Sequence, residues 1–260
     1  MSQDQVYLTQ GRENIHVLET VDSTNTYAKR LALEGAPDGT VVLADSQSGG
    51  RGRLGREFCS PAGKGLYLSV LWRPECSPEA LFPLTALAAV AAVRAIERIT
   101  QMRPGIKWPN DLVVRRKKVG GILTEMAMEQ GGDRVDYVVL GIGINVHPAA
   151  FDGDVAEVAA SLEEQWGIEI SRQELAAALI GELDILRREI LFRPSLWLEE
   201  YRSSCLNLGR TVQLIQDGER VMGVATEIDE QFGLLVRLLD GSHVMVRSGE
   251  VSLRGMYGYI

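Results

Sequence analysis

The strongest constraint on the fold of this chain is a change of pattern near Asn207. Beyond it, hydrophobic residues alternate with polar ones in short runs, as they do in half-buried strands. These runs occupy residues 211–216, 221–228, 233–239 and 242–247. Asp217-Gly218 and Asp240-Gly241 lie between them, and both positions of such dipeptides favour the positive φ of hairpin turns. The pattern predicts a small C-terminal all-β barrel of about fifty residues.

The chain before Asn207 instead mixes predicted strands with predicted helices. Strands are expected at residues 15–19, 41–45, 66–72, 107–114, 119–128 and 135–146, and a turn at Pro109 should interrupt the fourth of these. Helices are expected at residues 22–34, 78–100, 155–166, 172–190 and 194–206. We therefore expect an α+β chain with two domains, a mixed-sheet domain over residues 1–207 and a β domain over residues 208–260.

The composition limits the compartment and the partners. The 260 residues carry a formal net charge of -8 and the pI is about 5.1, whereas a nucleic-acid-binding domain is usually basic. Three cysteines without metal-site spacing indicate free thiols, and the polar N-terminus has no signal-peptide pattern. The longest apolar stretch, residues 80–93, is too short to span a bilayer and predicts a core helix. We expect a cytoplasmic protein that binds neither nucleic acid nor membranes.

The most distinctive motif is Gly49-Gly50-Arg51-Gly52-Arg53-Leu54-Gly55-Arg56, here called the arginine loop. Arginine presents a fork of donors suited to phosphate and carboxylate oxygens, and glycine lets backbone N–H groups approach an anion. The run is too glycine-rich for a regular helix or strand. It predicts a mobile loop that orders around a small phosphate-bearing ligand. From the residues alone, a solvated turn and an RNA-binding segment remain alternatives.

Three further motifs carry polar groups. Ser23-Thr24-Asn25 offers donors and acceptors at a helix N-terminus, suited to a polar ligand head or to a simple helix cap. Residues 107–111 and 118–123 bring two lysines, an amide and a carboxylate to strand ends, although Lys118 also belongs to a run of solvated charges. Residues 141–146 lack the third glycine of a dinucleotide fingerprint, so their alternating glycines predict a flat wall beside a ligand.

Taken together, these motifs closely resemble those of the biotin protein ligases, also called biotin–[acetyl-CoA-carboxylase] ligases. The matching stretches are residues 23–25, 50–56, 107–111, 118–123, 141–146 and 248–254. They follow one another with family-like spacing over nearly the whole chain, so the ordered set is specific although each motif alone is weak. The resemblance implies a mixed-sheet catalytic domain of the class II synthetase and biotin ligase type, followed by a small SH3-like β-barrel.

The resemblance also implies a reaction and the residues that serve it. The family makes biotinyl-5′-adenylate from biotin and ATP, then passes biotin to one lysine of a biotin carboxyl carrier protein. The residues implied to bind biotin are Ser23, Thr24, Asn25, Gln47, Arg51, Gly52, Arg53, Lys118, Gly121 and Gly143. The residues implied to bind the nucleotide are Arg51, Arg53, Arg56, Phe58, Lys107, Asn110, Asn145 and Arg254.

The chemistry of this reaction suggests catalytic roles for three residues. Attack of the biotin carboxylate on the α-phosphate brings two anions together, and Arg53 and Lys118 are expected to offset their repulsion. Mg²⁺ is expected to bridge phosphate oxygens, with Asp111 as a hard ligand. Asp111 is also the candidate that assists loss of a proton from the carrier lysine in the second step.

Two departures from the family pattern narrow these expectations. The aromatic pair that often follows the arginine loop is replaced by Glu57-Phe58-Cys59, so only Phe58 remains to stack on adenine. About twenty residues precede Ser23, too few for the DNA-binding helices of some members, so we expect a ligase without repressor activity. Members of the family often dimerise through the sheet of the large domain, which makes a homodimer an expectation by resemblance.

Two other functions stay open at this point. A lipoate ligase or octanoyltransferase of the same superfold would share the carrier lysine. An octanoyltransferase needs a nucleophilic cysteine, however, and Cys59, Cys76 and Cys205 lack an obvious activating context. The polar 23–25 motif also suits a ureido ring better than a bare acyl tail. A non-catalytic nucleic-acid-binding protein would use the arginine loop and the barrel without ATP turnover.

Overall fold

The computed structural model describes residues 14–151, 153–190, 194–216, 219–247 and 252–255, and these form two β-sheets. The larger sheet has the strand order β1-β2-β3-β7-β6-β5-β4. Its strands are β1 (Ile15–Val21), β2 (Thr40–Gln47), β3 (Gly65–Trp72), β4 (Gly105–Lys107), β5 (Asp111–Val114), β6 (Lys117–Met128) and β7 (Val135–Asn145). β1 and β2 are parallel and the other neighbours are antiparallel, so the predicted mixed sheet is confirmed.

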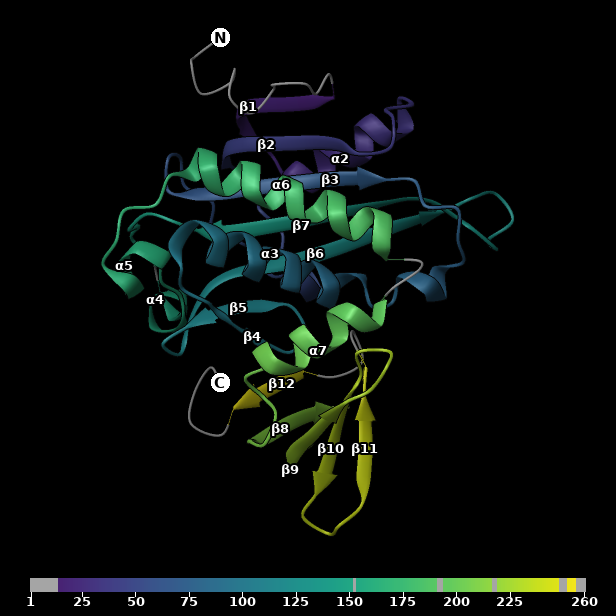
Figure 1. The fold of residues 1–260 in the computed structure, drawn as a ribbon, viewed down its shortest axis with the longest axis vertical. Helices are drawn as coiled ribbons and strands as arrows, with labels where there is room; N and C mark the ends of the chain where they lie inside the picture. The colour runs from purple at the N-terminus through teal and green to yellow at the C-terminus, as the bar shows by residue number, and fades with distance from the viewer. Residues whose placement is uncertain (1–13, 152, 191–193, 217–218, 248–251, 256–260) are drawn as a thin grey trace.

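The helices of the large part of the chain lie on both faces of this sheet, with α3 and α6 in front of it in Figure 1. They are α2 (Thr24–Leu33), α3 (Leu84–Thr100), α4 (Asp154–Val158), α5 (Leu162–Trp166), α6 (Arg172–Glu189) and α7 (Pro194–Ser204). Most of the predicted helices are therefore present, although the segment expected to be one helix over 155–166 is divided into α4 and α5.

The two faces of β7 have different neighbours because successive residues of a strand point to opposite sides. Ile142 and Ile144 belong to the main hydrophobic core with buried residues of α3 and α6. Val139 packs instead in a smaller core with Ala28 of α2. The α2 face continues along β7 to Gly141, where the lack of a side chain leaves room for the side chain of Asn25.

The long apolar segment expected as one helix is also divided. A short 3-10 turn, η2 (Pro78–Leu81), precedes α3, and Pro83 takes the N-cap position of α3. By length and composition the stretch Pro78–Thr100 would suffice to cross a membrane, yet 67% of its most apolar window is buried inside the protein. α3 packs against α6, α7 and β6, which supports the prediction of a core helix.

The smaller sheet is antiparallel and has the order β11-β10-β9-β8-β12. Its strands are β8 (Thr211–Gln216), β9 (Glu219–Ile228), β10 (Leu234–Leu238), β11 (His243–Val246) and β12 (Ser252–Gly255). The predicted small all-β unit is present, but among the described residues no ladder joins β11 to β12, so its barrel is not closed. At the turn between β10 and β11, Gly241 has φ +88°. The other predicted turn, Asp217-Gly218, lies outside the described residues.

The small sheet contacts the large part of the chain below β4 and α7 (Figure 1). Trp108 donates its backbone N–H to Asn207 Oδ1 at 2.7 Å and its indole N–H to the Phe232 carbonyl at 2.9 Å. The Tyr201 and Phe232 rings meet edge to face at 5.4 Å. These contacts hold the segment around Trp108 between the two sheets. The predicted domain boundary after residue 207 stays a prediction.

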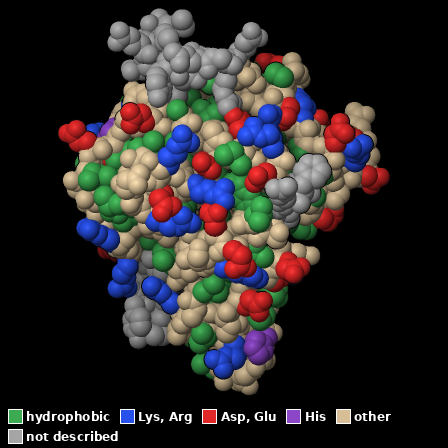
Figure 2. Space-filling model, viewed as in Figure 1, with side chains coloured by type: hydrophobic (Ala, Val, Ile, Leu, Met, Phe, Trp, Pro, Cys, Tyr) green, Lys and Arg blue, Asp and Glu red, His purple; other side chains and the backbone are tan. Residues whose placement is uncertain are grey.

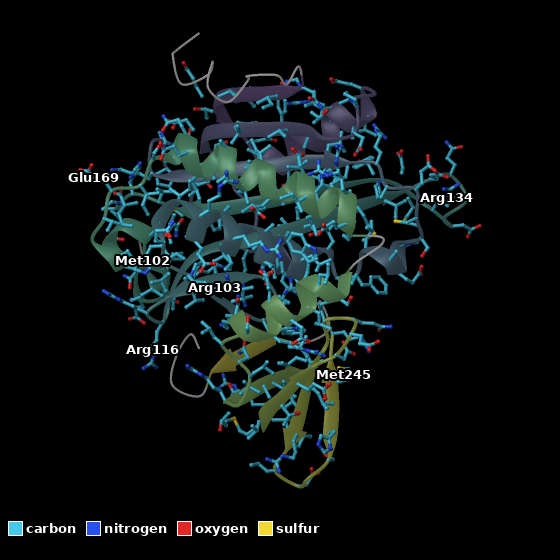
Figure 3. The ribbon with its side chains drawn as sticks, viewed as in Figure 1. Met102, Arg103, Arg116, Arg134, Glu169 and Met245 are labelled. Carbon is cyan, nitrogen blue, oxygen red and sulfur yellow. The ribbon has the colours of Figure 1, made fainter. Side chains whose placement is uncertain are left out.

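The surface over α3 and α6 has interspersed acidic and basic side chains, without one dominant sign (Figure 2). Two hairpin tips project from opposite ends of the large sheet, marked by Arg116 between β5 and β6 and by Arg134 between β6 and β7 (Figure 3). Arg115 and Arg116 have φ of 46° and 69°, which asparagine and glycine adopt more readily than arginine. The main cavity includes Gly141 and Gly143 of β7 and extends to Lys118, two residues beyond Arg116.

Candidate functional site

A cavity of about 1150 Å³ brings together almost all of the predicted site residues. Its lining includes Ser23, Thr24, Asn25, Gln47, Arg51, Gly52, Arg53, Arg56, Phe58, Lys107, Asn110, Asp111, Lys118, Gly121, Gly143 and Asn145. Arg254 is the exception: its backbone pairs with Gln213 in the small sheet, and its side chain lies outside the description. This volume slightly exceeds the roughly 300–1,000 Å³ of ordinary small-molecule pockets, so the cavity has room for more than one small ligand.

One end of the cavity has a hydrogen-bonded group, here called the polar cluster, formed by the half-buried Gln47 and the buried Thr24, Asn25, Ser60 and Ser69, the last of which lies behind the cavity wall. Ser69 Oγ lies 2.8 Å from Thr24 Oγ1 and 2.6 Å from Asn25 Oδ1. Gln47 Oε1 accepts from the Thr24 backbone N–H at 2.8 Å, which satisfies one of the free N–H groups at the start of α2. Gln47 Nε2 reaches Ser60 Oγ at 2.8 Å.

Ser23 begins α2 as its N-cap residue, but its hydroxyl makes no capping hydrogen bond to the helix. The side chain is only 3% exposed and lies on the cavity wall. The simple helix-cap interpretation of the 23–25 motif is therefore insufficient. The motif contributes polar atoms to the cavity.

Glu125 on β6 lies behind the polar cluster and was absent from the sequence prediction. Its Oε2 accepts from Asn25 Nδ2 at 2.9 Å, and its Oε1 is 2.8 Å from Lys29 Nζ and 3.5 Å from Arg51 Nη1. Burial alone would raise the pKa of Glu125, but hydrogen bonds from Lys29 and Asn25 and the two positive charges hold it below its ordinary value. The carboxylate therefore connects α2 with the arginine loop.

The glycines of β7 are explained by close neighbours. A Cβ at Gly141 would lie 2.1 Å from Asn25 Oδ1, and a Cβ at Gly143 would lie 2.6 Å from the Phe58 ring. A Cβ at Gly120 would lie 2.7 Å from the Gly143 carbonyl oxygen. Side chains and backbone of the protein itself therefore approach these strand glycines closely, and the flat wall beside a ligand stays a prediction.

The arginine loop forms a miniature hairpin rather than an irregular coil. Arg51 and Glu57 make an antiparallel bridge, and the Gly52 N–H donates to the Arg56 carbonyl at 2.7 Å. At its tip Leu54 and Gly55 have φ of 57° and 72°, the two positive values of a tight hairpin turn. Leucine is poorly suited to this conformation, so the tip of the loop is strained.

Arg53 points from this hairpin to the strand end at Asn110. Its Nη1 donates to Asn110 Oδ1 at 3.0 Å, and Asn110 Nδ2 donates to the Ile122 carbonyl at 2.9 Å. Burial lowers the pKa of Arg53 below its ordinary value, while the nearby Asp111 acts in the opposite direction. A guanidinium remains charged under these conditions, so this end of the cavity presents a partly desolvated cation.

Lys118 and Asp111 form the second charged group. Lys118 Nζ lies 2.6 Å from Asp111 Oδ1, and both residues lie on the cavity wall together with the buried Lys107. Within the described part of the chain, no group of three or more His, Cys, Asp or Glu side chains could hold a metal ion. One carboxylate still fits Mg²⁺, because this ion commonly takes one or two protein carboxylates and completes its shell with phosphate oxygens and water.

Part of the cavity wall was missed from the sequence. Trp108 and the segment around α4 also line the cavity, through residues that include Phe151, Val155 and Val158. Trp108 lies within a motif that was identified, but only its contacts with the small sheet reveal why it is buried. The α4 residues lack a motif of their own. Their hydrophobic spacing predicted a helix, but it did not predict that this helix lines the cavity.

Comparison with known proteins gives an independent view of the same chain. Residues 17–145 match the Biotin/lipoate A/B protein ligase family, and residues 208–254 match the Biotin protein ligase C terminal domain. The biotin–[acetyl-CoA-carboxylase] ligase of Mycobacterium tuberculosis is 34% identical over 250 residues, which cover 93% of this chain and 89% of that protein. The bifunctional ligase/repressor of Bacillus subtilis is 36% identical over 228 residues, which cover 86% of this chain and 69% of that protein.

The fold is also similar to that of a solved structure. A biotin protein ligase from Aquifex aeolicus in complex with biotin and ATP has a TM-score of 0.79 and 30% sequence identity to this chain. The match covers 94% of this chain and 99% of that one. The similarity therefore extends over both the seven-stranded and the five-stranded sheets.

Proposed function

Since this chain belongs to the biotin protein ligase family, we propose that it joins biotin to AMP with ATP and transfers biotin to a lysine of a biotin carboxyl carrier protein. The observation that carries this proposal is the single cavity that has a buried polar cluster at one end and Arg53, Lys118 and Asp111 at the other. The first end suits an uncharged polar ring, and the second suits a carboxylate next to phosphates.

In the first step, a biotin carboxylate oxygen attacks the α-phosphorus of ATP and pyrophosphate leaves. Arg53 and Lys118 lie where two approaching anions need positive charge, and we assign them to stabilise the charge that develops. In the structure, Lys118 Nζ lies 2.6 Å from Asp111 Oδ1. We expect Lys118 to exchange this partner for the biotin carboxylate and the adjacent phosphate. We propose that Asp111 would then hold Mg²⁺, which would supply charge neutralisation at the phosphates.

In the second step, the amine of the carrier lysine attacks the acyl carbon of the mixed anhydride and AMP leaves. The attacking amine must first lose a proton, and we assign Asp111 to assist this loss. The test is transfer from preformed biotinyl-adenylate by an Asp111→Ala variant. A rate close to that of the wild-type protein would contradict the assignment.

The remaining roles follow the same division of the cavity. We propose that Ser23, Thr24, Asn25 and Gln47 contact the ureido ring, with Gly121 and Gly143 beside the biotin. The adenylate would be enclosed by Arg51, Gly52 and Arg53. The residues proposed to contact the nucleotide are Arg56, Phe58, Lys107, Asn110, Asn145 and Arg254. Phe58 is supported as an aromatic surface by its position on the cavity wall, packed over Gly143.

The experiment that tests this function is mass spectrometry of a biotin carboxyl carrier domain incubated with the protein, biotin, ATP and Mg²⁺. We expect a biotin adduct on the carrier lysine that requires ATP. Parallel reactions with lipoate and octanoate test the alternative of the same superfold, which the named relatives do not favour. An adduct with lipoate or octanoate but not with biotin would overturn the proposed substrate.

Several finer expectations stay predictions. Cytoplasmic localisation and homodimer formation are testable by fractionation and by light scattering. The absence of repressor activity is testable by operator binding at physiological salt, where sequence-specific binding would contradict it. RNA binding that depends on salt, without ATP turnover, would favour the nucleic-acid-binding alternative.

A further inference from the structure

We propose that Glu125 is a positioning residue that sets the orientation of the Asn25 amide, so that this amide offers only its oxygen to the ligand. The proposal rests on the proposed function, because it concerns how the polar cluster selects a ring that carries N–H groups. Glu125 acts through Asn25 and does not itself line the cavity. It thereby helps to determine which class of ligand the polar cluster accepts.

The donors and acceptors around Asn25 fix the direction of its amide. Asn25 Nδ2 lies 2.9 Å from Glu125 Oε2 and 3.3 Å from the Leu123 carbonyl oxygen. A carboxylate and a carbonyl only accept hydrogen bonds, so the group that faces them has to be the NH2. Both amide hydrogens are then used, and Asn25 retains no donor for a ligand.

The oxygen of the amide consequently faces the other way. It accepts from Ser69 Oγ at 2.6 Å, and a carbonyl oxygen has two lone pairs, so it can accept a second hydrogen bond. Asn25 is only 3% exposed, and the missing Cβ of Gly141 leaves the space that its oxygen occupies. Ser69 uses one lone pair of this buried oxygen, so the second lone pair favours a ligand that brings an N–H.

Lys29 and Arg51 stabilise the Glu125 carboxylate in different ways. Lys29 is on α2, four residues after Asn25, and its Nζ lies 2.8 Å from Glu125 Oε1. Arg51 lies farther from the same oxygen, at 3.5 Å, and belongs to the arginine loop. If the loop moves to enclose a ligand, Lys29 still neutralises Glu125. The orientation of Asn25 is thus maintained whether Arg51 is engaged or not.

This arrangement distinguishes a cyclic urea from an acyl tail. The two N–H groups of a ureido ring need acceptors, and Asn25 Oδ1 supplies one of them. A saturated acyl chain or a dithiolane ring has no N–H and would leave the second lone pair of this oxygen without a donor. A site that hydrogen-bonds a ligand N–H discriminates strongly against analogues that lack it. Glu125 is therefore a specificity-determining residue that works from behind the cavity wall.

The test compares biotin binding by the wild-type protein and a Glu125→Gln variant, measured by isothermal titration calorimetry. The amide at position 125 has only one accepting oxygen, whereas Lys29 and Asn25 both donate. Its NH2 therefore has to face one of these two donors, and that hydrogen bond is lost. We expect the Kd for biotin to rise about 10-fold to 100-fold, as for loss of a charged hydrogen bond. Glu129→Gln, which changes an exposed glutamate just beyond the end of β6, is the matched control and should leave the Kd within about twofold.

A double-mutant cycle with Asn25→Ala separates positioning from general stabilisation. If Glu125 acts through Asn25, Glu125→Gln changes the Kd less than about threefold in the Asn25→Ala background. Equal effects in both backgrounds would overturn the proposal, and so would an unchanged Kd in the single Glu125→Gln variant. Thermal unfolding followed by circular dichroism checks that each variant is folded.

Lys29→Met provides a second route if Glu125→Gln does not fold. We expect it to raise the Kd for biotin about 3-fold to 10-fold in the wild-type background and far less in the Asn25→Ala background. Equal effects in both backgrounds, or no effect in either, would overturn the proposal. Failure of the proposed function is distinguishable, because the wild-type protein itself would then neither bind biotin nor form a biotin adduct on the carrier.

Discussion

The two ends of the cavity differ in how far their polar side chains are buried and hydrogen-bonded to other groups of the protein. At the polar cluster, Thr24 and Asn25 are 4% and 3% exposed and are hydrogen-bonded to Gln47, Ser69 and Glu125. At the arginine loop, Arg51, Leu54 and Arg56 are exposed. The comparison indicates a preformed end that recognises a ligand and a charged end that needs a ligand to complete it.

Charge gives a physical reason for this difference. The arginine loop places three guanidinium groups within six residues, and the neighbouring Arg56 contributes to lowering the pKa of Arg53, whose main cause is burial. A phosphate removes this repulsion and accepts the hydrogen bonds that the arginines offer. The polar cluster is uncharged apart from Glu125 behind it, which is already paired with Lys29. Its geometry therefore does not depend on an incoming anion.

The largest effect is expected from Lys118→Ala at the charged end. Removing one preorganised cation that faces the developing charge should slow adenylate formation by about 10² to 10³, as observed for single electrostatic donors in other enzymes. The rate is measured by single-turnover release of pyrophosphate. Lys117→Ala is the matched control, since its Nζ bonds the Glu157 carbonyl instead. A reduction of less than tenfold would show that Lys118 does not stabilise the reacting anions.

Gly141→Ala tests the preformed end. Its Cβ would meet Asn25 Oδ1 at 2.1 Å, so Asn25 has to move and the polar cluster is disrupted. We expect the Kd for biotin to rise about 10-fold to 100-fold and the protein to lose about 1–3 kcal/mol of stability. Calorimetry and thermal unfolding measure the two effects.

Gly181→Ala is the control for this substitution. Gly181 lies within α6, and a Cβ there meets no atom within 4 Å. The change should stabilise the protein by about 0.5–1 kcal/mol and leave biotin binding unchanged. If Gly141→Ala bound biotin as tightly as Gly181→Ala, the polar cluster would not be the rigid recognition element described above.

Leu54→Asn tests whether the hairpin is the resting conformation of the arginine loop. Asparagine adopts the positive φ of 57° at this position more readily than leucine, so the hairpin should be stabilised by up to about 1 kcal/mol. Tryptic cleavage at the loop arginines, followed over time, should slow about two- to fivefold without any ligand. Faster cleavage of the variant would mean that the hairpin is not the resting conformation of the loop.

The smallest effect concerns the pH dependence of stability. The pKa of Glu125 lies below its ordinary value of 4.5, so its charged form is favoured in the folded protein. Its contribution is therefore present above pH 4.5 and is lost as the pH falls through the lowered pKa. The difference in unfolding free energy between wild type and Glu125→Gln should shrink below pH 4.5, by about 1 kcal/mol or less. A difference that is independent of pH would contradict this.

Much of the fold followed from local patterns. Alternation of hydrophobic residues predicted β8 to β11 and most strands of the large sheet, because each strand buries one face. Local patterns did not reveal that β12 pairs with β8, nor that the small sheet stays open among the described residues. Such pairings depend on contacts between residues far apart in the chain. Pro83 was visible in the sequence, but its effect of separating η2 from α3 was not anticipated.

Site residues that form short motifs could be predicted from the sequence. Residues that only hold other site residues in place were missed. Asn25, Arg53 and Lys118 belong to short motifs that carry the family resemblance. Ser69 and Glu125 lie on ordinary strands, and their polar side chains resemble those of any half-buried strand. Only the distances from Asn25 to both residues reveal their role. A residue that positions a functional group has no local signature of its own.

The most direct test of this account is hydrogen–deuterium exchange of the protein alone, with biotin, and with biotin plus a non-hydrolysable ATP analogue. We expect residues 67–69 and 141–145 to be protected in all three states, because they belong to central strands of the polar end. Residues 49–58 should gain protection of tenfold or more, on the order expected for a newly ordered loop, mainly when the nucleotide is present. Equal protection of the arginine loop in all three states would contradict the division into a preformed end and a ligand-completed end.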